Sequence, residues 1–279
     1  MIKNLTELIH NALYEDLEEH GDVTSIATID GDTMGTADII AKEDGILAGG
    51  FVVEKVFYLV DPNIAVEIQY DDGHCLKKGD VAFVIKGPMR SILTGERTAL
   101  NLLCRMCGIA TLTSRFTKVV EGTGVKILDT RKTTPGLRSL EKYAVRVGGG
   151  YNHRIGLYDM VLIKENHIVA ANGITNAVNR CRDYLKKNDL DLKIEVECRT
   201  LNEVEEAVNL QVNRIMLDNM TVSEIEEAVK LVAGRVKLEI SGGVNLKNIA
   251  DYTATGVDYI SIGALTHSAR ALDLSLLVK

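Results

Sequence analysis

The 279-residue chain has no tryptophan and only 3 prolines, and it lacks long apolar runs. No stretch reaches the roughly 18 or more apolar residues that a membrane-spanning helix needs. The N-terminus also lacks the charged-then-apolar order of a secretion signal. We therefore expect a protein with no membrane association that acts in the cytoplasm. Its 46% hydrophobic content is ordinary for a globular protein, and its length suits one large and one smaller domain.

Cysteine is scarce and irregularly spaced. Five cysteines, an odd number, form no disulfide framework, which indicates a reducing compartment. Cys104 and Cys107 have the spacing of a metal or redox pair, but they lie in an apolar helical run and no second pair follows. The cysteines therefore predict no zinc site.

Positive charge is in the minority, but it is concentrated in one part of the chain. The net charge of -7 argues against nucleic acid or an anionic membrane as the main partner, because both select broad basic surfaces. A cationic cluster nevertheless lies between residues 129 and 167, and it predicts a pocket for a small ligand that carries phosphates and carboxylates. The cluster contains Arg131, Lys132, Arg138, Lys142, Arg146, His153, Arg154, Lys164 and His167.

The hydrophobic pattern changes along the chain. Apolar residues at helical spacing between Leu5 and Leu13 predict an amphipathic helix within residues 1–25, followed by a turn and a loop. Short alternating runs with turn residues over 34–92 predict a small sheet-containing domain. A long helix is expected from about residue 90 toward residue 120, with a break near Gly108. From about residue 125 a short strand, a polar residue and a helix alternate, which predicts parallel strands in an α/β barrel. The predicted strands end at Asp129, Lys164, Glu197, Asp218, Ser241 and Gly263.

Two glycine-containing loops follow the last two predicted strands. Active sites of such barrels lie at the carboxyl ends of the strands, and backbone N–H groups before a helix bind phosphate well. The segments Ser241–Asn245, before a helix expected from Leu246, and Gly263–Ser268 therefore predict a phosphate site. Tight strand-to-helix turns remain the alternative for both loops.

Two carboxylates, Glu197 and Asp218, end neighbouring predicted strands. Next to a phosphate, such oxygen ligands suit Mg²⁺, and they could also stabilise a cationic sugar centre. The alternative is that one of them pairs with a lysine of the cationic cluster.

The arginines of the cationic cluster suit a dicarboxylate. Arg131 and Arg154 each present a planar fork that matches a carboxylate, and His153 adds a further donor. Lys164 also permits a rival reading as a Schiff-base lysine of an aldolase-type enzyme, although that chemistry does not need the other cations or the two carboxylates.

Motifs along almost the whole chain resemble the quinolinate phosphoribosyltransferase family, also called carboxylating nicotinate-nucleotide pyrophosphorylases. They occur in order and at family-like spacing. The motifs are Glu15–Leu17, Gly21–Ser25, Gly95–Asn101, Asp129–Arg138, Lys142–Val145, Gly148–Arg154, Leu162–His167, Glu195–Cys198, Met216–Met220, Ser241–Gly243 and Ser261–Ser268.

The resemblance implies a type II phosphoribosyltransferase fold. An N-terminal α/β sandwich domain would span residues 1–110 and be joined by the C-terminal segment 268–279. An incomplete α/β barrel of parallel strands, the catalytic domain, would span residues 111–267.

The resemblance also implies a reaction of de novo NAD biosynthesis. The enzyme, a pentosyltransferase, would transfer phosphoribose from phosphoribosyl pyrophosphate to quinolinate and release pyrophosphate and carbon dioxide, giving nicotinate mononucleotide. Mg²⁺ would be the cofactor, held directly or indirectly by Glu197 and Asp218.

Individual roles follow from the same resemblance. Quinolinate would be held by Arg131, His153, Arg154 and Lys164, together with Arg97 from the neighbouring subunit of a dimer or larger homo-oligomer. Lys132, Lys164, Glu197 and Asp218 would carry the catalysis at the phosphoribosyl pyrophosphate, and Ser241, Gly242, Gly243, Ser261, Ile262 and Gly263 would bind its 5-phosphate.

Three alternatives remain on the sequence alone. A pyrophosphorylase-like protein associated with molybdenum transport resembles this family but has another substrate. A non-catalytic barrel would bind quinolinate without converting it. A plain nicotinate phosphoribosyltransferase would not need so many cations for its monocarboxylate.

Overall fold

The computed structural model describes residues 4–279, and residues 1–3 of the expected N-terminal domain lie outside this range. The chain divides into two compact units. The first unit contains residues 4–114, 133–149 and 265–279, and the second contains residues 115–132 and 150–264. The domain boundary that the sequence places at residue 110 stays a prediction.

The first unit is built on a four-stranded antiparallel sheet with the order β12-β1-β5-β3. The last strand of the chain therefore pairs with the first, with Leu276 opposite Ile39. A separate pair of short strands is formed by β2 and β4. The elements that begin in this unit are α1 (Leu5–Leu17), α2 (Val23–Thr28), β1 (Met34–Ala41), β2 (Gly45–Ile46), α3 (Gly50–Val60), β3 (Ala65–Ile68), β4 (Cys75–Leu76), β5 (Val81–Pro88), α4 (Met89–Val119), α5 (Arg138–Val147) and β12 (Leu274–Val278).

Helix α4 is continuous, so the expected break near Gly108 is wrong. A Cβ atom at Gly108 would lie 2.0 Å from the backbone oxygen of Arg270 and 3.0 Å from Cα of Ala271. Glycine is therefore needed here for the close approach of another backbone segment, not for a change of direction. Sequence alone does not distinguish these two uses of a helical glycine.

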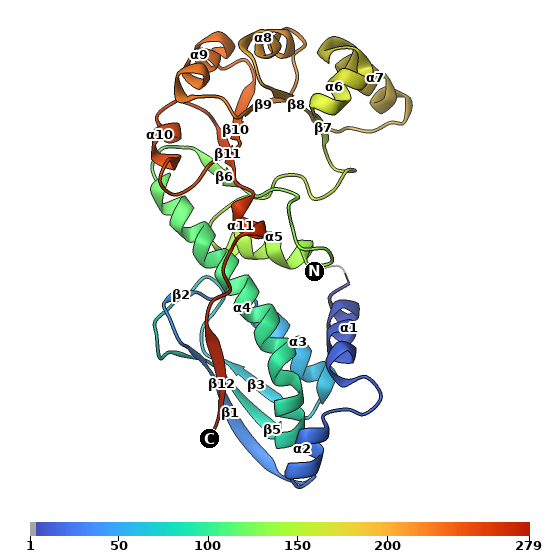
Figure 1. Ribbon diagram of the computed structural model, residues 1–279, viewed down its shortest axis with the longest axis vertical. Coiled ribbons are helices and arrows are strands. Elements are labelled where there is room, and N and C mark those ends of the chain that lie inside the picture. Colours follow the sequence, from blue (N-terminus) through green and yellow to red (C-terminus); the bar gives the residue numbers. More distant parts are fainter. Residues whose placement is uncertain (1–3) are drawn as a thin grey trace. The chain divides into compact units, whose positions relative to one another are not determined.

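The second unit contains a six-stranded sheet with the order β6-β11-β10-β9-β8-β7, and neighbouring strands run parallel. The end strands β6 and β7 are not hydrogen-bonded to each other, so the barrel is incomplete. In Figure 1, α7, α8 and α9 cover the outer side of these strands. The elements are β6 (Lys126–Leu128), β7 (Val161–Ile163), α6 (Glu165–Ala171), α7 (Ile174–Lys187), β8 (Ile194–Cys198), α8 (Leu201–Asn209), β9 (Arg214–Asp218), α9 (Val222–Val232), β10 (Lys237–Ser241), α10 (Ile249–Thr253), β11 (Tyr259–Ser261) and α11 (Ala264–His267).

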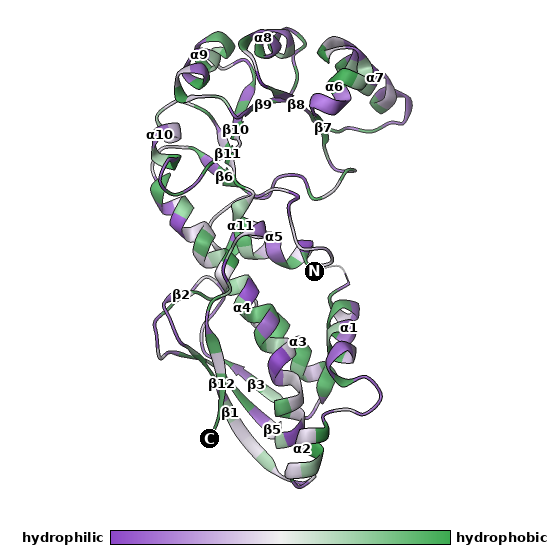
Figure 2. Ribbon diagram, viewed as in Figure 1, coloured by the Kyte–Doolittle hydropathy of each residue, from purple (hydrophilic) through white to green (hydrophobic). Residues whose placement is uncertain are grey.

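The outer helices begin at recognisable caps and bury one apolar face. The side chains of Thr200 and Thr221 accept hydrogen bonds from the backbone N–H groups of Glu203 and Glu224. In turn, each glutamate carboxylate accepts a hydrogen bond from the backbone N–H of its capping threonine. Two exposed donors are satisfied at each helix start by this capping box. Figure 2 shows hydrophobic and hydrophilic residues alternating around these helices, as expected for one buried side.

The six parallel strands confirm the predicted α/β barrel, with small differences at their ends. Strand β8 extends past Glu197 to Cys198. The helix expected from Leu246 begins only at Ile249, because residues 245–248 form a turn in which Asn248 donates to the carbonyl of Gly243. Among residues 4–279, no helix is both long and apolar enough to span a membrane.

Candidate active site

A cavity of about 450 Å³ lies at the carboxyl ends of the parallel strands of the second unit. This volume is within the range of small-molecule sites, and the position is where barrel enzymes place their chemistry. All of its lining residues belong to the second unit. They are Thr130, Arg131, Lys132, His153, Arg154, Leu162, Lys164, Glu197, Met216, Asp218, Ser241 and Ser261.

The cavity brings together most of the side chains that the sequence singled out. Arg131 and Lys132 follow β6, His153 and Arg154 follow the Gly148–Gly150 loop, and Lys164 follows β7. The others come from the ends of β8, β9, β10 and β11, namely Glu197, Asp218, Ser241 and Ser261.

The remaining predicted site residues do not line the cavity. Gly242 and Gly243 follow β10 and both have positive φ, and a Cβ at Gly242 would lie 2.1 Å from Oδ1 of Asn219. Ile262 is buried and donates its N–H to Leu128. Gly263 follows β11 directly before α11.

Arg97, also outside the cavity lining, lies on α4 in the first unit with an exposed side chain. Its guanidinium is 3.9 Å from Glu96. Its expected role in a neighbouring subunit stays a prediction.

The two carboxylates of the cavity each face a cation. Lys164 Nζ lies 3.5 Å from Oε2 of Glu197, and Arg199 Nε lies 3.4 Å from Oδ2 of Asp218. Arg199 also pairs with Glu165 at 2.5 Å, and the sequence reading had overlooked it. These contacts are partly exposed, so they hold the carboxylates in place only weakly.

The arginines of the cavity are held close together at a cost in free energy. Burial, and then repulsion from Arg131, lower the pKa of the Arg154 guanidinium, while Glu195 acts in the opposite direction. Among the described residues, the buried Nε of Arg131 has no hydrogen-bond partner. A buried donor without an internal acceptor, next to a second guanidinium, is suited to an anionic ligand.

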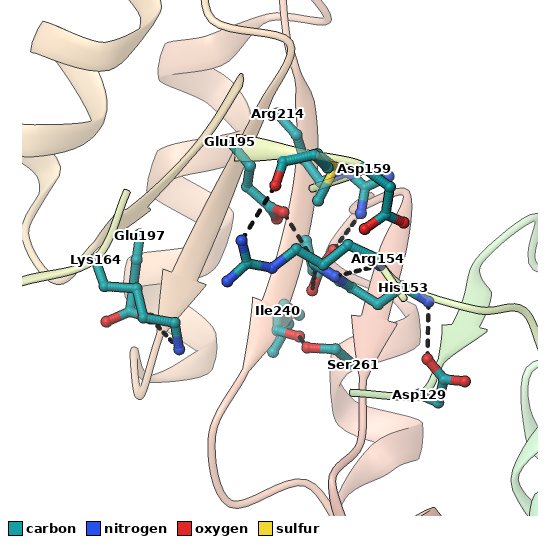
Figure 3. A network of polar contacts seen from close by, with 12 residues as sticks. Asp129, His153, Arg154, Asp159, Lys164, Glu195, Glu197, Arg214, Ile240 and Ser261 are labelled. Atoms are coloured by element: carbon teal, nitrogen blue, oxygen red, sulfur yellow. Dashed lines mark hydrogen bonds and ion pairs between the residues drawn. The ribbon is translucent and has the colours of Figure 1, made fainter. Parts of the chain in front are cut away.

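His153 is fixed by several contacts, which Figure 3 shows. Its backbone N–H donates to Oδ1 of Asp129 at 2.9 Å, and its Nδ1 accepts the N–H of Arg154 at 2.8 Å. A ring nitrogen that accepts a hydrogen bond carries no hydrogen, so Nε2 carries it. Nε2 lies 3.0 Å from Oε2 of Glu195 and 3.5 Å from Oε1 of Glu239.

Glu195 and Glu239 are completely buried inside the barrel, on β8 and β10. Burial raises the pKa of each carboxyl to about 7. Arg214 on β9 lies 2.6 Å from Oε2 of Glu239, and its guanidinium lies 4.3 Å from the ring centroid of Tyr259. Two buried carboxyls that share one arginine cannot both carry a negative charge at low cost. They are therefore expected to share one proton near neutral pH.

No role was expected for Glu195 or Glu239 from the sequence. The available signal was the period of two along a strand, which places Glu195 on the same side of β8 as Glu197, and Glu239 on the same side of β10 as Ser241. A charged residue two positions before a strand-end site residue lies on the same face of the strand and points inward beneath the site. Reading the strands by face would have identified both.

Within residues 4–279, two groups of side chains have the chemistry to hold a metal. His153, Glu195 and Glu239 offer ligand atoms within 4.8 Å of one another, but the hydrogen on Nε2 of His153 blocks the lone pair that a metal needs. Glu197 and Asp218 line the open cavity and offer carboxylate oxygens, which fit Mg²⁺. Only the second group is suited to a metal that meets a substrate.

The fold and the cavity together define an α/β-barrel enzyme with a site for small anionic substrates at the carboxyl edge of its strands. The family model of the quinolinate phosphoribosyl transferase C-terminal domain matches residues 109–277, and that of the N-terminal domain matches residues 22–107. The chain therefore belongs to the quinolinate phosphoribosyl transferase family.

Individual relatives agree with this assignment. The chain is 42% identical to a probable nicotinate-nucleotide pyrophosphorylase (carboxylating) of Bacillus subtilis, over 98% of this chain and 92% of that protein. It is 46% identical to quinolinate phosphoribosyltransferase (decarboxylating) 1b of Nicotiana tabacum, over 98% and 82%. The structure is similar to that of NadC from Streptococcus pyogenes, with a TM-score of 0.95, 40% identity and coverage of 100% and 98%.

Proposed function

We propose that the protein transfers the phosphoribosyl group of phosphoribosyl pyrophosphate to the ring nitrogen of quinolinate, with loss of the 2-carboxylate as carbon dioxide. The products are nicotinate mononucleotide and pyrophosphate. The family assignment supports this reaction, and the single structural observation that carries it is the composition of the cavity. Four cations, Arg131, Lys132, Arg154 and Lys164, share one pocket with Glu197 and Asp218.

Quinolinate is assigned to the side of the cavity formed by the arginines. Its two adjacent carboxylates match the forks of Arg131 and Arg154, and they neutralise the repulsion that lowers the pKa of Arg154. Lys164 adds a third cation that pairs only weakly with Glu197, at 3.5 Å, and can turn to a ligand. A monocarboxylate would leave part of this charge uncompensated.

Phosphoribosyl pyrophosphate is assigned to the side formed by the ends of β8 to β11. The glycines after β10 have positive φ and would turn backbone N–H groups toward its 5-phosphate, and Ser261 ends the neighbouring strand β11. Glu197 and Asp218 would hold Mg²⁺ near the ribose and pyrophosphate. When bound, the ion would neutralise charge on the leaving pyrophosphate.

The reaction follows from this placement. The quinolinate nitrogen attacks the anomeric carbon while the bond to pyrophosphate breaks, and pyrophosphate leaves with the electron pair. Glu197 and Asp218 stabilise the positive charge that develops on the sugar. The cationic ring nitrogen then accepts the electrons of the breaking bond between the ring and the 2-carboxylate, and a proton replaces the carbon dioxide.

A dimer or larger homo-oligomer completes the proposal, with Arg97 acting in the cavity of a neighbouring subunit. Its exposed side chain is available for such a contact. Mixing two inactive variants, Arg97→Ala and Lys132→Ala, would test this. A mixed dimer combines an intact cavity with an intact Arg97, so activity should return on mixing; two variants that stay inactive after verified subunit exchange would contradict shared sites. The cytoplasmic location stays a prediction.

The binding of each substrate alone tests the assignment within the cavity. Arg131→Ala should lose quinolinate affinity and keep affinity for phosphoribosyl pyrophosphate in calorimetric titrations. Asp218→Asn should show the reverse. Equal losses of both ligands in both variants would argue against two distinct halves.

A further inference from the structure

We propose that Glu195 and Glu239 are positioning residues that hold His153, and through it the backbone of Arg154, in the arrangement that binds the dicarboxylate. This inference rests on the proposed function, because it concerns the same cavity. It gives a role to two buried side chains that do not line the cavity.

The two carboxyls are buried with few of the hydrogen bonds that normally compensate burial. Glu195 and Glu239 are 0% exposed, and neither oxygen of Glu195 has a hydrogen bond of normal geometry in the part of the chain that the structure describes. A barrel interior filled with apolar side chains would avoid the cost of burying them. Their presence on β8 and β10, the two strands that pair with β9, needs a reason other than packing.

Between them, the two carboxyls contact Arg214 and His153. Nη1 of Arg214 lies 2.6 Å from Oε2 of Glu239, and the guanidinium of Arg214 lies over the ring of Tyr259. Nε2 of His153 lies 3.0 Å from Oε2 of Glu195 and 3.5 Å from Oε1 of Glu239. The pair therefore connects strands β8, β9 and β10 to one imidazole.

Nδ1 and the backbone N–H of His153 also form hydrogen bonds. Nδ1 accepts the N–H of Arg154 at 2.8 Å, and the backbone N–H of His153 donates to Asp129 at 2.9 Å. The guanidinium of Arg154 donates to the carbonyl of Met160 at 3.1 Å. Since Nδ1 can accept only while Nε2 carries the hydrogen, the carboxyls that face Nε2 fix the tautomer that holds Arg154.

The consequence is a chain of contacts from the barrel interior to the substrate clamp. His153 acts as an anchor between the two carboxyls and Arg154, and both of its ring nitrogens face protein groups. The sequence reading treated this histidine as a ligand donor. Removal of the carboxyls should free the ring and displace Arg154.

The tautomer of His153 can be measured directly in the wild-type protein. The ¹⁵N chemical shifts of its two ring nitrogens distinguish a protonated from an unprotonated nitrogen, and the proposal expects the hydrogen on Nε2. A hydrogen on Nδ1 in the ligand-free protein would overturn it. This readout does not depend on activity or on the tolerance of the fold to substitution.

Substitutions then test the effect on binding. Glu195→Leu removes the carboxyl 3.0 Å from Nε2, and quinolinate affinity should fall by about tenfold or more, the factor expected when displacement of Arg154 costs the ligand one hydrogen bond to a charged group. Glu195→Gln keeps an acceptor oxygen and should recover most of that affinity. Affinity for phosphoribosyl pyrophosphate should stay within about twofold in both variants, as for a site that is not coupled to the change.

Asp258→Asn is the matched control. Asp258 precedes β11 and pairs with Lys237 at the start of β10, so it lies at the opposite edge of the same sheet. This variant should bind both ligands as the wild type does. Quinolinate affinity that is unchanged in a folded Glu195→Leu variant, or lost equally in the Asp258→Asn control, would overturn the proposal. Failure of the wild type itself to bind quinolinate would instead contradict the proposed function, and the tautomer would still test the anchoring.

Discussion

Replacement of Arg154 by glutamine should weaken quinolinate binding without destabilising the fold. Burial and the neighbouring Arg131 both lower the pKa of the Arg154 guanidinium, so its charge opposes folding in the absence of a ligand. The substitution also removes a hydrogen bond of 3.1 Å to Met160, which contributes roughly 1 kcal/mol. Relief of the repulsion offsets this loss, and we expect the free energy of unfolding to change by less than about 1 kcal/mol.

The expected effect on binding is larger. Hydrogen bonds between an arginine and a carboxylate contribute about 1.5–3 kcal/mol, so the affinity for quinolinate should fall by about 10- to 150-fold. The affinity for phosphoribosyl pyrophosphate should change by no more than about twofold, because that ligand is assigned to the other side of the cavity. The preference for quinolinate over nicotinate should also narrow, since one of the carboxylates loses its partner.

Calorimetric titration of each ligand alone, with chemical denaturation for stability, measures both effects. Arg182→Gln is the control, because Arg182 is an exposed arginine of the same unit that donates to the backbone oxygens of Leu210 and Gln211. The Arg182→Gln variant also removes one arginine charge, but at a position outside the cavity lining. The reasoning would be refuted if quinolinate affinity fell equally in this control, or if both ligands were lost equally from Arg154→Gln.

Three further predictions follow from the structure. Glu197→Gln and Asp218→Asn should each weaken the binding of phosphoribosyl pyrophosphate with Mg²⁺ and leave quinolinate binding equal or stronger, because a negative charge is removed; weaker quinolinate binding in separate titrations would contradict this. Glu195 and Glu239 have their pKa raised to about 7 from 4.5, so the folded state binds more protons in this window and stability should fall as pH rises through it, by roughly 3 kcal/mol for one proton. Chemical denaturation from pH 5 to 8 should show a smaller fall in the Glu195→Gln, Glu239→Gln double variant, and an identical fall would contradict the prediction. Gly108→Ala places a Cβ 2.0 Å from a backbone oxygen and should destabilise the protein by about 1–3 kcal/mol or more, with a lower melting temperature as the measurement; an unchanged melting temperature would show that the backbone moves freely.

The parallel barrel was predictable because its signal is repeated. Six short apolar segments were each followed by a helix, five of them ended in a polar residue and the sixth in Gly263, and the structure has strands at all six. The cavity followed from the same rule, since residues such as Lys164 and Asp218 could be placed at one edge of the sheet without knowledge of distances.

Features that depend on tertiary contacts were not predictable in the same way. Gly108 lies inside the continuous helix α4 and leaves room for a backbone segment about 160 residues further along the chain. Local sequence does not show that this segment packs there. The delayed start of α10 at Ile249 depends on a turn closed by Asn248. The partners of Glu195 lie on other strands and on the loop that carries His153, and a local pattern does not show which of them meet.

A product assay tests the central claim most directly. Purified protein would be given Mg²⁺, phosphoribosyl pyrophosphate and quinolinate labelled in the 2-carboxylate, and labelled carbon dioxide and nicotinate mononucleotide would be followed together. We predict that both appear in equal amounts. If neither appears while quinolinate still binds in a calorimetric titration, the protein is a binding protein or a relative with another substrate, and the proposed reaction is contradicted.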